Sequence, residues 1–145
     1  MEYSVRTPDQ MREVAREILA ELSTNMGARV LALSGDLGAG KTTFVKAFAR
    51  ELGIDEVVTS PTFGLMRNYV IPKDTSTPFR RLVHIDAYRL EVEDDLSSLG
   101  WADIVTDFEA LVCIEWPERV SEALPFNTMP VTFTHIDEQT RNVKW

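Results

Sequence analysis

The sequence predicts an α/β fold in which a mixed parallel and antiparallel sheet is flanked by helices. The first observation is a complete G-x-x-x-x-G-K-[ST] motif at residues 35–42. The second is its setting, because the apolar run of residues 30–33 precedes it and a helical stretch from Thr43 to Leu52 follows it. The third is a series of later β-rich segments, some spaced as antiparallel pairs. Together they indicate the P-loop NTPase fold.

The motif has the composition of a phosphate-binding loop. Its glycines allow backbone N–H groups to close around phosphate oxygens. Lys41 is placed to reach the β- and γ-phosphates, and Thr42 offers its hydroxyl to Mg²⁺. The residues predicted to bind the nucleotide here are Asp36, Leu37, Gly38, Ala39, Gly40, Lys41, Thr42 and Thr43. We therefore expect a nucleoside triphosphate and Mg²⁺ as ligands.

The elements around the motif have clear boundaries. Thr7 is placed as the N-cap of a first helix, with Pro8 at its first position and Gln10 completing a capping box. Apolar residues then recur on one helical face up to Leu22, so this helix should pack on the sheet. A strand is expected at residues 29–34. Gly53 stands where a helix usually ends.

The rest of the chain is predicted to complete the same domain. Residues 62–71 and 80–88 should form an antiparallel pair, joined by a mobile loop at 72–78. We expect a short acidic helix at 91–99 closed by Gly100, a buried strand at 110–115, and a final hairpin of residues 130–137 and 141–145. No linker is long enough to divide the chain, which predicts a single P-loop ATPase domain over residues 1–145.

Composition narrows the classes of partner and the compartment. The 145 residues include 15 basic and 23 acidic ones, giving a net charge of −8, which has the wrong sign for direct binding to nucleic acid. A protein partner is expected instead. Cys113 has no second cysteine to pair with and should be a buried, inert thiol. No signal peptide and no apolar run near the ~18 residues of a membrane span are visible, so a cytoplasmic protein without membrane contact is expected.

Two acidic residues are candidates for the second metal ligand that a phosphate-binding loop needs. Mg²⁺ keeps several water ligands and takes few from the protein, typically a carboxylate at the end of a neighbouring strand. Asp86 ends the run Leu82-Val83-His84-Ile85-Asp86, and Glu115 ends the run Leu111-Val112-Cys113-Ile114-Glu115. Spacing leaves open which of the two contacts Mg²⁺ and which orients the attacking water.

Four further features have two readings each. Residues 59–63 are placed where segments that sense the γ-phosphate often lie, or form an ordinary Ser-Pro turn. His84 shares a strand face with Asp86, and a structural, hydrogen-bonded role is favoured over proton transfer. Arg89 is suited equally to phosphate charge and to an ion pair. Trp116 either walls the nucleotide pocket or an interface, or packs in the core.

Taken in order, these segments resemble the TsaE family, the small bacterial ATPases of the tRNA threonylcarbamoyladenosine machinery. The resemblance is carried by Gly35 to Thr43, then Ser60-Pro61-Thr62-Phe63, then His84-x-Asp86-x-Tyr88-Arg89, then Ile114-Glu115-Trp116-Pro117. It spans nearly the whole chain. No later motif is decisive alone, but the four together in this order are specific.

The resemblance implies an ATPase that docks on a dimer of TsaB-like and TsaD-like subunits. Hydrolysis there resets the machinery between rounds of modifying adenosine-37 of tRNAs reading ANN codons, and tRNA is met only through the complex. By position, Lys41 and Thr42 would hold phosphate and Mg²⁺, Glu115 would act at the metal, and Asp86 would support hydrolysis. Thr7 would lie near the adenine. Lys41, Asp86 and Glu115 are thus the predicted catalytic residues, and Thr42, Glu115 and Asp86 the predicted metal site.

Two other functional classes are compatible with the loop. A small-molecule kinase shares it, but such enzymes usually need an arginine-bearing lid and an acceptor pocket, for which this chain leaves little room. A binding module would hold ATP without turning it over and expose a docking surface through residues 60–63. Neither the guanine-reading N-K-x-D sequence nor an adenine-reading counterpart is visible, so the residues alone do not identify the base; the missing guanine signature and the resemblance favour ATP over GTP.

Overall fold

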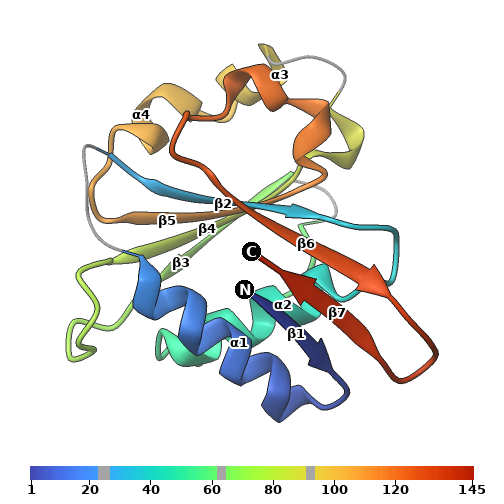
Figure 1. Ribbon diagram of the computed structural model, residues 1–145. Helices are drawn as coiled ribbons and strands as arrows, with labels where there is room; N and C mark the ends of the chain where they lie inside the picture. Colours follow the sequence, from blue (N-terminus) through green and yellow to red (C-terminus); the bar gives the residue numbers. More distant parts are fainter. Residues whose placement is uncertain (23–26, 62–64, 91–93) are drawn as a thin grey trace.

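One mixed sheet organises the computed structural model, which describes residues 1–22, 27–61, 65–90 and 94–145 (Figure 1). Across the described residues the sheet has seven strands in the order β1-β7-β6-β2-β5-β4-β3. The strands are β1 (Glu2–Val5), β2 (Arg29–Ser34), β3 (Met66–Val70), β4 (Arg81–Asp86), β5 (Ala110–Glu115), β6 (Met129–His135) and β7 (Arg141–Lys144). The predicted α/β class with a mixed sheet is confirmed.

Strand direction sets where the functional residues gather. β6, β2, β5 and β4 are parallel neighbours, whereas β3, β7 and β1 pair antiparallel to the strands beside them. β1 therefore runs in the same direction as β6. The carboxyl ends of β1, β2, β4, β5 and β6 consequently meet at one edge of the sheet, which is the edge where open α/β sheets bind ligands.

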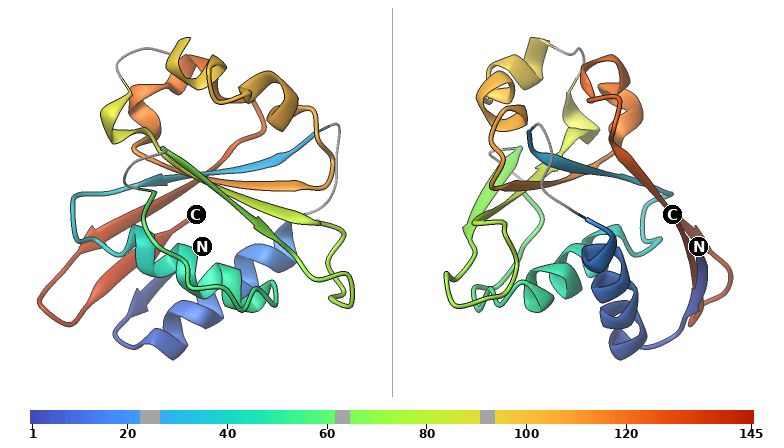
Figure 2. Two further views of the ribbon diagram at one scale, coloured as in Figure 1. Left: turned by 180° about the vertical axis from the view of Figure 1, so that it is seen from behind. Right: turned by 60° about the vertical axis from the view of Figure 1, so that its left-hand side comes forward.

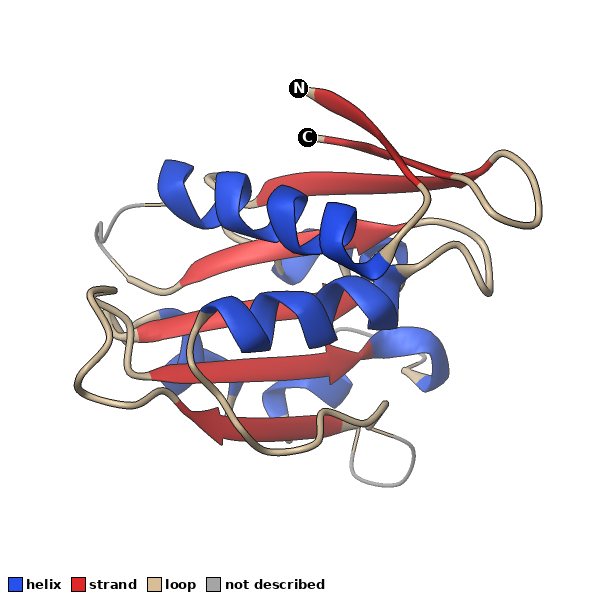
Figure 3. Ribbon diagram, turned by 90° about the horizontal axis from the view of Figure 1, so that it is seen from below, coloured by secondary structure: helices blue, strands red, loops and turns tan. Residues whose placement is uncertain are grey.

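Helices cover both faces of this sheet (Figures 1 and 2). Helices α1 (Pro8–Glu21) and α2 (Lys41–Glu51) lie side by side on one face, as Figure 3 shows. The short helices α3 (Asp94–Ser97) and α4 (Trp101–Val105) lie on the other, with the 3₁₀ turns η1 (Ala87–Arg89), η2 (Pro117–Arg119) and η3 (Ser121–Ala123). A buried apolar cluster fills the space under each helical layer.

The first helix forms as its sequence predicts. The Thr7 side chain accepts a hydrogen bond from the Gln10 amide, and the Gln10 side chain accepts from the Thr7 amide, so the capping box is confirmed. The apolar face is buried at Met11, Val14, Ala15 and Ile18. This cap also fixes the place where the chain leaves β1 and enters α1, next to the carboxyl edge of the sheet.

Several predicted boundaries shift. The second helix begins at Lys41, two residues earlier than expected, and Leu52 is its C-cap. The strand expected at 80–88 ends at Asp86, because the Asp86 carboxylate accepts a hydrogen bond from the Tyr88 amide and starts η1. Of the strand expected at 62–71, residues 66–70 are confirmed and 62–64 lie outside the described residues.

The remaining predictions divide between confirmed and missed elements. The strand at 110–115 and the final hairpin are confirmed, with small shifts at the hairpin ends. Of the helix expected at 91–99, α3 covers 94–97, and 91–93 lie outside the described residues. β1 and α4 were not predicted. None of the described helices is both long and apolar enough to span a membrane.

Candidate functional site

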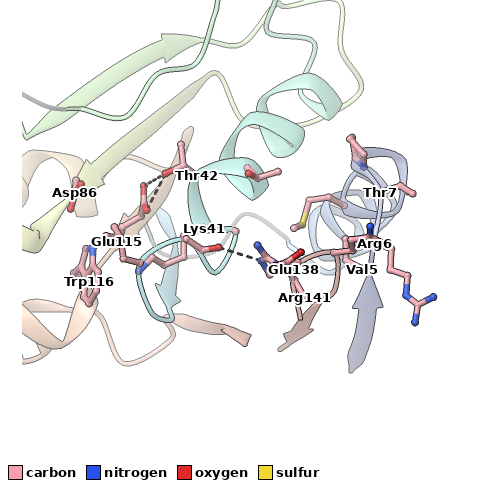
Figure 4. A pocket seen from close by; sticks show the side chains of 17 residues that line it. Val5, Arg6, Thr7, Lys41, Thr42, Asp86, Glu115, Trp116, Glu138 and Arg141 are labelled. Atoms are coloured by element: carbon pink, nitrogen blue, oxygen red, sulfur yellow. Dashed lines mark hydrogen bonds between the residues drawn. The ribbon is translucent and has the colours of Figure 1, made fainter. Parts of the chain in front are cut away.

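A cavity of about 490 Å³ lies at the carboxyl edge of the sheet (Figure 4). In Figure 4, Asp86, Glu115 and Trp116 lie at one end of it and Val5, Arg6 and Thr7 at the other, with Lys41 and Arg141 between. Its lining residues are Val5, Arg6, Thr7, Pro8, Met11, Leu37, Gly38, Gly40, Lys41, Thr42, Thr43, Asp86, Glu115, Trp116, Glu138, Gln139 and Arg141. Residues spread over the whole sequence therefore share one cavity.

The loop between β2 and α2 has a backbone that only glycine adopts readily. Gly38 has φ 80° and Gly40 has φ 109°, both in the left-handed region. A Cβ atom at Gly38 would meet no other atom within 4 Å, so the conformation and not the space requires glycine there. Gly40 is the N-cap of α2 and carries no side chain that would cap it. The first amide groups of α2 therefore lie behind the cavity without a capping side chain.

Lys41 extends from the first turn of α2 into the cavity. Only 5% of the Lys41 surface is exposed. Its ammonium group donates a hydrogen bond to the Gly35 carbonyl oxygen. The ammonium nitrogen also lies 3.6 Å from the centre of the Trp116 ring. Burial lowers the Lys41 pKa, although Glu115, Glu118, Asp86 and Asp36 oppose that shift. Lys41 is thus a buried basic group that lines the cavity.

Thr42 and Glu115 lie together at one end of the cavity. The Thr42 hydroxyl lies 3.3 Å from each carboxylate oxygen of Glu115. Glu115 is buried at the end of β5, and its Oε2 atom lies 2.6 Å from Nε2 of His84 on β4. His84 is therefore buried and hydrogen-bonded, as predicted. The structure thus places a carboxylate directly beside the hydroxyl of the motif.

Asp86 lies at the same end of the cavity but makes a different contact. It ends β4 opposite Glu115 of β5 in the strand register. Its Oδ1 atom accepts a hydrogen bond from the Tyr88 amide at 3.0 Å. Of the two carboxylates that the sequence left undecided, Glu115 is the one in hydrogen-bond contact with Thr42.

Trp116 follows Glu115 and has the unusual φ of 58° for a residue with a side chain. A bulky residue in the left-handed region is strained, and such strain is typical of functional positions. Its ring lines the cavity and packs against the Tyr88 ring at 5.1 Å between centroids. It also contacts the apolar cluster under α4. Trp116 thus both walls the cavity and packs against the core.

Most of the predicted nucleotide-binding residues line this cavity, and two do not. Asp36 and Ala39 belong to the loop but are outside the lining. The Ala39 side chain is buried in the cluster beneath α1 and α2, and its amide donates to the Asp36 carbonyl oxygen at 3.0 Å. Thr7, which the resemblance put near the adenine, lies at the far end from Glu115.

Sequence reasoning missed the contribution of the C-terminal hairpin. Arg141 at the start of β7 donates through Nε to the Gly38 carbonyl oxygen at 3.2 Å and through a guanidinium nitrogen to the Asp137 carbonyl oxygen at 2.8 Å. It thereby ties the motif loop to the hairpin loop. Glu138 and Gln139 of that hairpin loop also line the cavity. The sequence predicted the hairpin that carries these residues, but not its position in the sheet, and so it gave no sign that they line the cavity.

The remaining candidates lie around the same edge. Arg89 is on η1, and a cavity of about 100 Å³ beside it is lined by Pro61, Leu65, Asp86, Tyr88 and Arg89. The Thr59 hydroxyl accepts a hydrogen bond from Arg67 at 3.2 Å. Residues 62 and 63 of the same predicted segment lie outside the described residues. Cys113 is a buried free thiol, and burial raises its pKa.

Curated relatives share the sequence over most of the chain. The chain is 38% identical over 114 residues to the tRNA threonylcarbamoyladenosine biosynthesis protein TsaE of Bacillus subtilis, covering 79% of this chain and 66% of that protein. It is 39% identical over 121 residues to the TsaE of Mycobacterium bovis, covering 80% of this chain and 70% of that protein. For the TsaE of Treponema pallidum the values are 38% over 115 residues, covering 79% and 78%. The chain thus spans about two thirds to four fifths of these relatives' lengths.

The fold is also similar to a solved structure, and a family-level comparison agrees. A crystal structure of YdiB from Bacillus subtilis matches with a TM-score of 0.74 and 26% identity, covering 99% of this chain and 82% of that one. The family model described as "Threonylcarbamoyl adenosine biosynthesis protein TsaE" matches residues 5–143. The chain therefore belongs to the TsaE family of threonylcarbamoyl adenosine biosynthesis proteins.

Proposed function

We propose that this protein is a Mg²⁺-dependent P-loop ATPase of tRNA threonylcarbamoyladenosine synthesis. It acts in the cytoplasm with TsaB-like and TsaD-like partners on adenosine-37 of tRNAs reading ANN codons, and ATP hydrolysis resets the complex. The observation that carries the proposal is the hydrogen bond between the Thr42 hydroxyl and the buried Glu115 carboxylate inside a cavity of about 490 Å³. Family membership supports the pathway.

The residues at this end of the cavity fit Mg²⁺. A hydroxyl and a carboxylate are oxygen donors, which this hard cation prefers. The described residues hold no group of three or more His, Cys, Asp or Glu side chains arranged for a metal. A sparse set suits Mg²⁺, which keeps most of its water ligands. Thr42 and Glu115 would hold the ion, which when bound neutralises charge on the phosphate oxygens.

The rest of the cavity fits a nucleoside triphosphate. Its volume falls within the roughly 300–1,000 Å³ of small-molecule sites. Lys41 supplies a buried cation, and the amino end of α2 supplies amide groups for phosphate oxygens. Thr7 and Arg6 lie at the end distant from Glu115, where the base would lie. Glu115 would hold the metal side of the triphosphate, and Asp86 would orient the attacking water.

Partner dependence provides the central test. A net charge of −8 disfavours direct contact with tRNA, so the protein should reach it only through the partner subunits. We expect slow ATP turnover by the protein alone and faster turnover when a TsaB-like and TsaD-like pair is added. The measurement is phosphate release at saturating ATP with and without the pair, and Lys41→Ala in the full mixture identifies the active subunit. Equal turnover under both conditions would contradict the proposal.

Arg141 should contribute to nucleotide affinity through the loop that it holds. Arg141→Met removes the hydrogen bonds to the Gly38 and Asp137 carbonyl oxygens while keeping much of the side-chain volume. We expect the ATP dissociation constant to rise about tenfold, the equivalent of one hydrogen bond from a charged group. Isothermal titration with a non-hydrolysable ATP analogue measures it. Lys144→Met on the same strand, whose side chain is exposed, should bind like the unmodified protein.

A further inference from the structure

The histidine behind Glu115 has no role in the function proposed above, although it is among the most buried polar residues. His84 has 0% of its surface exposed, and Glu115 has 4%. Nε2 of His84 and Oε2 of Glu115 lie 2.6 Å apart, which is within hydrogen-bond distance. This pair therefore joins the end of β5 to the interior of β4.

The strand register explains why the two side chains meet. β4 and β5 are parallel, with His84 opposite Cys113 and Asp86 opposite Glu115. Residues two apart on a strand share a face, so His84 and Glu115 are diagonal neighbours on the face covered by α1 and α2. Leu82 and Cys113 on the same face belong to the apolar cluster there. The His84 ring therefore lies on the face that this apolar cluster covers, with its hydrogen bond directed to Glu115.

The polar contacts of the ring identify the direction of its hydrogen bond. Among the described residues, Nδ1 of His84 is buried and has no hydrogen-bond partner, so Nε2 makes the single polar contact of the ring. A carboxylate oxygen is a hydrogen-bond acceptor, so we assign the proton of this contact to Nε2. The Thr42 hydroxyl is equidistant from both Glu115 oxygens, whereas His84 contacts Oε2 alone. Oε1 therefore makes fewer hydrogen bonds with described residues than Oε2 does.

We propose that His84 is a positioning residue for the ATPase reaction: its Nε2–H group holds Oε2 of Glu115 and thereby aims Oε1 and the Thr42 hydroxyl at one point. This inference rests on the proposed function, since the point is where Mg²⁺ would be held. Residues that orient metal-binding side chains typically contribute 10–100-fold to metal affinity or activity. His84 would act through Glu115 and would not touch the nucleotide.

Two substitutions separate positioning from packing. His84→Leu keeps apolar volume and removes the donor, whereas His84→Gln places an amide N–H group near the former Nε2. We expect His84→Leu to raise the Mg²⁺ concentration for half-maximal ATP hydrolysis about tenfold and to lower kcat about tenfold, with the KM for ATP nearly unchanged. His84→Gln should recover most of both losses. His135→Gln, at an exposed histidine of β6, is the matched control. Equal impairment of both His84 variants, or none in His84→Leu, would overturn the proposal.

A second measurement does not depend on turnover. Nitrogen-15 NMR of the unmodified, metal-free protein distinguishes which ring nitrogen carries the proton, and the chain has 2 histidines to assign. We expect His84 to be protonated at Nε2 with a strongly downfield proton that moves upfield in Glu115→Ala. A ring protonated at Nδ1 alone, or a signal unaffected by Glu115→Ala, would overturn the positioning role. Absence of ATP hydrolysis with and without partners would refute only the proposed function.

Discussion

Lys41→Met is expected to slow ATP hydrolysis by about two to three orders of magnitude and, at the same time, to stabilise the ligand-free protein. Loss of a cation aimed at the phosphates should lower kcat/KM by about 100–1,000-fold, the range found for removing one group that stabilises transition-state charge. Stability should rise because Lys41 is buried, and burial lowers its pKa, which means that folding disfavours its charged form. Methionine fills similar space without a charge.

The gain in stability should depend on pH with a defined sign. Because folding lowers the Lys41 pKa from its ordinary value of 10.5, the unfolded chain binds the proton more tightly than the folded chain in the window below 10.5. The unmodified protein therefore gains stability as pH rises through this window. The advantage of Lys41→Met should be largest near neutral pH and shrink toward pH 10, as urea unfolding at several pH values would show.

Lys46→Met provides the matched control for both effects. Lys46 is on the same helix but exposed, so its replacement should change neither turnover nor the pH dependence of unfolding. A Lys41→Met protein that is less stable than the unmodified chain at neutral pH would contradict the inferred cost of burying the charge. Unchanged turnover in that variant would contradict the role of Lys41 at the phosphates. The two readouts thus test separate parts of the interpretation.

Local signals explain which elements could be predicted from the sequence. The Thr7 capping box, the glycine-rich loop and the apolar run at 110–115 are each encoded within a few adjacent residues, and each is confirmed as an element. β1 could not be predicted, because its four residues become a strand only by pairing with β7, at the other end of the chain. α4 is a five-residue helix whose N-cap, Gly100, looked like the end of the preceding one.

The same distinction applies to the cavity. Lys41, Thr42, Asp86 and Glu115 could be proposed because a motif and two strand ends imply them before any strand order is known. Arg141 could not, because its place beside Gly38 depends on β6 pairing in parallel with β2 and β7 folding back on β6. The contact between His84 and Glu115 likewise depends on the register of β4 and β5. The reactive residues could be proposed from local sequence, whereas the residues that contact them could be identified only from the order and register of the strands.

We expect Glu115→Gln and Asp86→Asn both to slow ATP hydrolysis, but only Glu115→Gln to raise the Mg²⁺ requirement. Glu115 contacts the Thr42 hydroxyl, so removing its charge should raise the Mg²⁺ concentration for half-maximal hydrolysis at least tenfold and lower kcat about 100-fold. Asp86 instead lines the cavity while its Oδ1 accepts from the Tyr88 amide. Asp86→Asn should lower kcat about 100-fold and leave the Mg²⁺ requirement nearly unchanged, as expected for a group that orients water.

Steady-state kinetics over a range of Mg²⁺ at saturating ATP, in the presence of the partner pair, would separate these roles. Glu118→Gln is the control, because Glu118 is exposed and still contributes negative charge near Lys41. Thermal unfolding of each variant would show whether the loss of turnover reflects the site or the fold. If Asp86→Asn alone shifted the Mg²⁺ requirement, the assignment would be reversed, and the contact between Thr42 and Glu115 would not mark the metal position. Equal shifts in both variants would mean that the two carboxylates hold the ion together, since adjacent parallel strands place them opposite each other.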